Sequence, residues 1–252
     1  MKMSGVLLAS LILVVSLPEK GITAEPGEPL EVAMLDEAPF SYAGGESREG
    51  CDPAFYRELL APLSGSYHFS GFPINRLMEV FARAKTDLMV TSAPTLAVPA
   101  NPAFEYLGPI YELNDVIVTR DQPLTSQIED FEGLRMGQPT GVCWTLCQAL
   151  AKVAIVERPF RSVAQGVNLL MAKRVDAIVA PENMFRMVLA AMSTQEPPPV
   201  VSFRGPSQYL FLAINRNLPP EVRQHIRNSF ERIGGAGYHR LCERVINERF
   251  LR

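Results

Sequence analysis

The sequence predicts an α/β protein of two similar lobes, and two observations carry this prediction. Strand-like and helix-like patterns alternate from Leu30 to Thr91 in the order strand, helix, strand, helix, strand. This order is typical of a parallel sheet flanked by helices. A second alternating set follows the apolar strand Asp115–Thr119, and two similar halves in one chain imply two lobes. The chain has 252 residues, 47% of them hydrophobic, which is enough for two cores.

The N-terminal residues predict export. Lys2 precedes an apolar run, Val6–Leu17, that is too short to span a bilayer, and small residues follow it at Thr23-Ala24. We therefore interpret residues 1–24 as a cleavable signal peptide. The first cysteine is Cys51, far from this run, so no lipid anchor is expected. We expect the mature protein in the periplasm, as a monomer.

The charge balance and the cysteines exclude some classes of function. A net charge of −3 gives no electrostatic reason to expect nucleic acid or an anionic membrane as partner. His68, His225 and His239 are scattered, and only His239 lies within four residues of a cysteine, so we expect no metal and no cofactor. Four cysteines permit three disulfide connectivities. Pairing Cys143 with Cys147 would leave Cys51 to meet Cys242 across the fold.

The elements of the first half follow from turn and helix signals. Strands are predicted at 30–35, 66–70 and 87–91. Asp52 is the expected N-cap of a helix that starts at Pro53 and ends at Gly65. The next helix follows Arg76, and its apolar face is predicted to carry Leu77, Val80, Phe81 and Ala84.

The second half repeats the alternation of strands and helices, and the C-terminal tail is expected to return to the first lobe. Strands are expected near 134–138, Ile155 and 176–180, with a helix over about 143–153. Ser162 and Gln165 form a capping-box pattern for the next helix, and Pro181 starts another. The tail carries a strand at 209–214 and helices from Pro219-Pro220 to Ile233 and over 238–247, which we expect to complete the first lobe. In this arrangement the chain crosses between the lobes twice, near 112–120 and near 204–210.

Several segments, taken in order, resemble the polar-amino-acid class of periplasmic solute-binding proteins, the receptors of ABC importers. The segments include EVAMLDEAPFSY, PINRLMEVFARAKTDLMVTSAPT, RSVAQGVNLLMAKRVDAIVA and YLFLAINRNLPPEVRQHIRNSFERIGG. The resemblance implies the two-lobed type 2 periplasmic-binding-protein fold, with two crossover strands as the hinge. It also implies lobe I from 25–116 plus 205–252, lobe II from 117–204, and closure of the lobes around a solute.

The resemblance places a ligand site between the lobes, at the carboxyl ends of the strands. The site residues that it implies are Glu37, Phe40, Tyr42, Phe72, Arg76, Thr91, Ser92, Thr95, Thr140, Gly141, Val142, Glu182 and Asn183.

The sequence departs from the family where the ligand would be held. Members that take α-amino acids usually follow the third strand with Thr-x-x-Arg, whose arginine clamps the ligand's carboxylate. Here Thr95-Leu96-Ala97-Val98 ends in valine, and no Lys or Arg occurs between Lys85 and Arg120. A carboxylate usual after the strand of lobe II is replaced by Pro181, with Glu182 next to it. A standard α-amino acid is therefore a doubtful ligand, and Arg76 is a candidate substitute cation that could equally pair on its own helix.

The resemblance implies a non-enzymatic receptor that captures a small polar solute, amino-acid-like or an organic acid, for an ABC permease. Two alternatives remain open. One is an enzyme like the exported cyclohexadienyl dehydratases, with Glu182 as a general acid. The other is a sensory or partner-binding module that kept the fold and lost transport.

Overall fold

The computed structural model describes residues 29–44, 47–61, 63, 67–93, 99–140, 145–153, 155–192 and 197–250. The strands are β1 (Leu30–Leu35), β2 (Tyr42–Gly44), β3 (Ser47–Glu49), β4 (Tyr67–Phe72), β5 (Leu88–Thr91), β6 (Phe104–Thr119), β7 (Arg135–Pro139), β8 (Val156–Phe160), β9 (Ala177–Pro181) and β10 (Val200–Asn215). Eight of them form one sheet in the order β4-β1-β5-β10-β6-β9-β7-β8, and β2 pairs with β3 separately.

The helices alternate with these strands along the chain. They are α1 (Cys51–Leu60), α2 (Ile74–Ala82), α3 (Thr145–Leu150), α4 (Val163–Met171), α5 (Glu182–Ala191), α6 (Pro220–Ile233) and α7 (Gly237–Phe250), with a 3-10 turn at Ile128–Phe131. In the described part of the chain no helix is both long and apolar enough to cross a bilayer.

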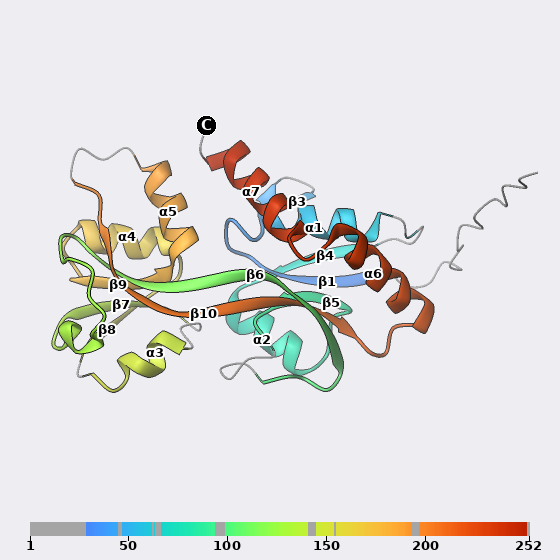
Figure 1. Cartoon of the computed structure of the whole chain (residues 1–252), viewed down its shortest axis with the longest axis horizontal. Coiled ribbons are helices and arrows are strands. Elements are labelled where there is room, and N and C mark those ends of the chain that lie inside the picture. The colour runs from blue at the N-terminus through green and yellow to red at the C-terminus, as the bar shows by residue number, and fades with distance from the viewer. Residues whose placement is uncertain are drawn as a thin grey trace, which may run out of the picture.

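Strand residues alternate between cores on the two faces of the sheet because successive side chains point to opposite faces. In β1, Val32 and Met34 pack in the core under α1, α6 and α7, whereas Ala33 between them packs against α2. In β9, Ile178 packs with α4 and α5, and its neighbour Val179 packs with α3. Helices therefore cover both faces of the sheet, as Figure 1 shows.

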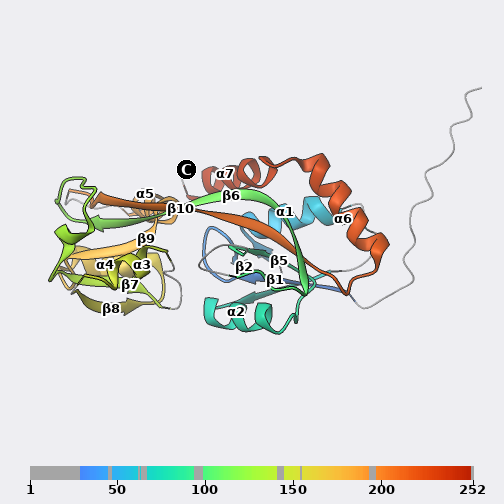
Figure 2. The same cartoon turned by 60° about the horizontal axis from the view of Figure 1, so that its bottom comes forward.

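The elements group into two lobes joined by β6 and β10. In Figures 1 and 2, β1, β4 and β5 lie with α1, α2, α6 and α7 in one lobe, and β7, β8 and β9 lie with α3, α4 and α5 in the other. β1 pairs in parallel with β4 and β5, and β7 pairs in parallel with β8 and β9. The predicted fold class, two mostly parallel lobes with two crossover strands, is confirmed.

The crossover strands are much longer than the sequence predicts. β6 and β10 have 16 residues each, whereas the expected strands covered 115–119 and 209–214. The two strands pair with each other as an antiparallel ribbon with a register shift between Arg204 and Ser207. At this shift a Cβ on Gly205 would lie 3.0 Å from the carbonyl oxygen of Asp115. The register shift indicates a β-bulge, which makes the ribbon irregular where it passes between the lobes.

Asp115 and Gln208 link the two crossover strands beside this shift. The Nε2 of Gln208 donates to the Asp115 carboxylate at 2.7 Å. Burial raises the pKa of Asp115 to about 6, and the hydrogen bond from Gln208 lowers it. The bond therefore stabilises the charged carboxylate in a place where burial disfavours it.

Replacing Gln208 with methionine is expected to lower the free energy of unfolding by about 1–2 kcal/mol at pH 8, because the partly buried carboxylate loses its donor. The deficit should shrink toward pH 4, where Asp115 is protonated in the folded protein. Urea unfolding of the Gln208→Met variant at both pH values measures this. Ser207→Ala is the matched control, since Ser207 bonds Asn114 in an exposed position. An equal deficit at both pH values would contradict the expectation.

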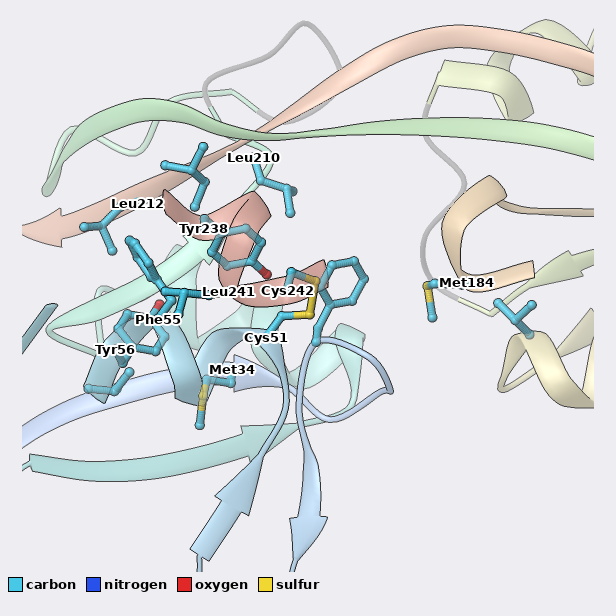
Figure 3. Packing of buried hydrophobic residues seen from close by; sticks show 14 of the residues in the cluster. Met34, Cys51, Phe55, Tyr56, Met184, Leu210, Leu212, Tyr238, Leu241 and Cys242 are labelled. Carbon is cyan, nitrogen blue, oxygen red and sulfur yellow. A yellow bond between two sulfur atoms is a disulfide. The ribbon is translucent and has the colours of Figure 1, made fainter. Parts of the chain in front are cut away.

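A disulfide and a buried hydrogen bond join the first helix to the last. Cys51 and Cys242 form a disulfide that links residues 191 positions apart. One residue later, Asp52 accepts a hydrogen bond from the Tyr238 hydroxyl at 2.5 Å, and both side chains are buried. Figure 3 shows Cys51, Cys242 and Tyr238 packed with Phe55 and Leu241 between α1 and α7.

The expected N-cap role of Asp52 is wrong. α1 begins at Cys51, its N-cap is Gly50, and no side chain caps it. Gly50 has φ 131°, and a Cβ there would lie 2.9 Å from the Pro39 carbonyl oxygen, so glycine fits this entry turn. The Asp-Pro pattern reproduces an N-cap signal, but the carboxylate instead turns inward to Tyr238.

Other boundaries differ by small amounts. The Ser162 cap of α4 is present, and the Ser162 hydroxyl accepts from the Gln165 N–H at 3.2 Å. The side chain of Gln165 returns to the N–H of Arg161 and not to that of Ser162. α2 ends at Ala82, before Ala84, which has φ 49°. α1 ends at Leu60, and its expected stop at Gly65 lies outside the described residues.

Candidate functional site

A hollow of about 320 Å³ lies between the lobes on the side of α4 and α5. From the first lobe it is lined by Glu37 and Ala38, in the loop that follows β1. From the second lobe it is lined by Ser162, the N-cap of α4, by Val163, Ala164 and Asn168 of α4, and by α5 and the residue after it. The residues that α5 and its end contribute are Met184, Met187, Val188 and Met192. The volume is at the lower end of the range for small-molecule sites.

Glu37 reaches from the first lobe to the second. Its carboxylate accepts a hydrogen bond from the backbone N–H of Val163 at 3.4 Å, across 126 residues of sequence. Val163 is the first residue of α4, so the carboxylate lies at the positive end of that helix. Burial raises the pKa of Glu37, and this hydrogen bond opposes the shift. The contact connects the two lobes directly.

The two charged residues proposed as ligand partners are already paired within the protein. Arg76 is exposed and forms a salt bridge with Glu79, three residues later on α2, at 2.6 Å. The carboxylate of Glu182 is bridged by Arg186 at 2.5 Å and by Arg204. Arg76 thus pairs with its own helix, and the carboxylate of Glu182 has two arginine partners within the second lobe and the crossover strand.

Several predicted site residues are buried in the protein interior. Phe40 is 5% exposed and belongs to the main core, so its aromatic ring packs within the lobe. Thr91 and Ser92, at the end of β5, are 6% and 4% exposed. The Thr91 hydroxyl accepts from the N–H of Ala93 at 3.2 Å, while no partner of the Ser92 hydroxyl is found among the described residues. Ser92 is thus a buried hydroxyl without a described partner at the carboxyl end of β5.

The remaining predicted residues divide into three that are partly exposed, one that is exposed and three that lie outside the described residues. Tyr42 and Phe72 are half-buried, and Phe72 packs against the core next to α2. Asn183 donates to the Tyr111 hydroxyl at 3.0 Å and accepts from the Met184 N–H. Thr140 is exposed and donates to the Phe160 carbonyl. Outside the described residues are Thr95, Gly141 and Val142, together with Cys143 and the side chain of Cys147.

Sequence reasoning missed the methionines of α5 and the start of α4. Met184 and Met187 have the spacing of one helix face, which is more often a core face than a ligand wall. Both are indeed mostly buried, yet both also line the hollow. In Figure 3, Met184 lies apart from the cluster around the disulfide, on the other lobe. Among the described residues, no group of three or more His, Cys, Asp or Glu side chains is placed to hold a metal ion.

Comparisons with known proteins bear on the fold. No protein-family model matches the chain, and no curated protein matches it by sequence. Solved structures do match. An ancestral arginine-binding protein bound to arginine is similar over 89% of this chain and 98% of its own, with 17% identity and a TM-score of 0.67. The GluR0 ligand-binding core in complex with L-glutamate covers 90% of this chain and 99% of its own, with 14% identity and a TM-score of 0.70.

A third structure is an amino acid ABC transporter substrate-binding protein from Streptococcus pneumoniae bound to L-arginine. It matches 88% of this chain and 96% of its own at 16% identity, with a TM-score of 0.66. At these identities the likeness is one of fold. The chain therefore has the two-lobed type 2 periplasmic-binding-protein fold, the fold of amino-acid-binding proteins.

Proposed function

We propose that this chain is a periplasmic solute-binding protein that captures a small polar solute between its lobes and delivers it to an ABC permease. The observation that carries the proposal is the hollow walled by Glu37 from one lobe and by α4 and α5 from the other. A site shared by two lobes is closed when they approach and opened when they part, which suits capture and release. The similar solved structures include an ABC transporter substrate-binding protein.

The proposal includes the remaining expectations from the sequence. Residues 1–24 are a signal peptide, and the mature protein works as a monomer without catalysis. Residues 25–116 and 205–252 form lobe I and residues 117–204 form lobe II. The carboxylate of Glu182 is held by Arg186 and Arg204, and this pairing favours a binding role over acid catalysis.

A thermal-shift screen tests the proposal. The panel should contain amino acids, amines and polyamines, opines, small carboxylates and aromatic acids. A ligand at about 100 times its Kd adds about 2.7 kcal/mol and raises the Tm by several degrees. We expect one chemical class to do this, and to reduce the radius of gyration in solution scattering as the lobes close. If no compound shifts the Tm, the solute-binding function is wrong. Turnover of prephenate or arogenate would instead assign a dehydratase.

A further inference from the structure

The walls of the hollow are chemically uneven. Met184, Met187 and Val188 present an apolar wall from α5, and Val163 and Ala164 extend it from α4, while Ser162 and Asn168 are the polar lining residues of this lobe. Methionine is unbranched and polarisable, so such a wall adapts to aromatic or aliphatic groups of different shape. A solute that fills this hollow must therefore carry an apolar body, in addition to the polar group that faces the first lobe.

Glu37 supplies the charge of this hollow. It is the one charged residue that lines the hollow among the described residues, and its carboxylate accepts a hydrogen bond from the Val163 N–H at 3.4 Å. This hydrogen bond is long for an N–H···O bond and leaves most of the carboxylate's acceptor capacity unused. A carboxylate removed from water without a cation is unfavourable, so a bound cation would stabilise it strongly.

Among the described residues no arginine lines the hollow, and four arginines are paired with other carboxylates. Arg48 bonds Asp36 at 2.7 Å, Arg76 bonds Glu79, and Arg186 and Arg204 share Glu182. None of these arginines lines the hollow. A ligand carboxylate placed there would meet Glu37 without a described cation to offset the repulsion between like charges.

We propose that the hollow binds an amine with an apolar body and no carboxylate, with its ammonium on Glu37 and its body against Met184, Met187 and Val188. This inference rests on the proposed solute-binding function and names its ligand class. It also explains the departure of the sequence from the amino-acid-binding pattern. Where the ligand has no carboxylate, the arginine clamp that Val98 replaces is not needed.

Titration calorimetry with three probes that share one aromatic body tests the proposal. The probes are 2-phenylethylamine, L-phenylalanine and 3-phenylpropionate. We expect the amine to bind at least about tenfold more tightly than L-phenylalanine and the acid not to bind, since one charge-assisted hydrogen bond is worth about ten- to hundredfold in affinity.

Three variants separate the two halves of the site. Glu37→Gln keeps an acceptor for Val163 and should weaken amine binding about tenfold or more. Met187→Ala should weaken it about threefold or more by reducing the apolar wall, and Glu157→Gln, an exposed residue of β8, should leave it unchanged. Thermal unfolding of each variant without ligand shows whether it is folded.

The outcomes distinguish this inference from the proposed function. Tight binding of L-phenylalanine or of the acid, with the amine about tenfold weaker, would overturn the ligand class and leave solute binding in place. Amine binding that Glu37→Gln does not change would overturn the site. If none of the probes and none of the wider panel binds, both proposals fail.

Discussion

Replacing both Cys51 and Cys242 with alanine is expected to lower the free energy of unfolding by about 2–4 kcal/mol. The bond joins residues 191 positions apart, so it removes a large amount of freedom from the unfolded chain. For a chain of this size the loss corresponds to a fall in Tm of roughly 5–15 °C. Urea and thermal unfolding of the double variant measure it.

The slope of the urea titration gives an independent check on the cause. An unfolded chain without the crosslink is more expanded and exposes more surface, so the m-value should rise in the double variant. Wild-type protein unfolded in the presence of a reductant is the control, and it should lose a similar amount of stability. A loss below about 1 kcal/mol, with an unchanged m-value, would show that the crosslink restricts the unfolded chain little.

Replacing Asp52 with asparagine is expected to remove a pH dependence of stability. Burial raises the pKa of Asp52 to about 7, and the hydrogen bond from Tyr238 lowers it. Between its ordinary pKa of about 4 and this raised value, the folded protein holds a proton that the unfolded chain releases. Stability therefore falls as the pH rises through this window, by up to about 1.4 kcal/mol per pH unit. Below the window this penalty is absent.

The free energy of unfolding of Asp52→Asn, relative to that of the wild type, should therefore rise by about 1–3 kcal/mol as the pH increases from 5 to 8. Subtracting the two urea-unfolding curves isolates Asp52 from Asp115, whose pKa is also raised. Tyr238→Phe gives a test of opposite sign. Without the hydroxyl the pKa of Asp52 rises further, so the decline in stability should extend to higher pH. A constant difference between wild type and Asp52→Asn would show that Asp52 has an ordinary pKa in the folded protein.

The fold was predictable where local patterns and tertiary packing agree. β1 matches the predicted strand in both bounds, since the apolar run ends at the turn that starts at Asp36. The crossover parts of β6 and β10 were not predictable in the same way. Glu112, Asn114 and Asp115 interrupt the apolar alternation of β6, and Gly205-Pro206 interrupts that of β10. These segments gain their strand conformation from pairing with each other, which no local window contains.

The position of the candidate site was predictable from the sequence, but the pairing of its charged side chains was not. Glu37 follows the first strand, so the rule for α/β sheets places it at the cleft. The pairing of Arg76 with Glu79 depends on side-chain conformations, and a sequence leaves both the surface and the ligand as options. The wall of α5 was missed because Met184 and Met187 satisfy the pattern of a core face and also line a hollow.

The strand order also sets when the first lobe can be finished. β5 has β1 on one side and β10 on the other, and residues 92–199 separate β5 from β10 along the chain. During synthesis from the N-terminus, β5 therefore remains an open sheet edge until β10, which starts at Val200, emerges. Pairing over so long a separation is intrinsically slow. We expect the nascent chain to be most prone to aggregation in this interval, before β10 covers that edge.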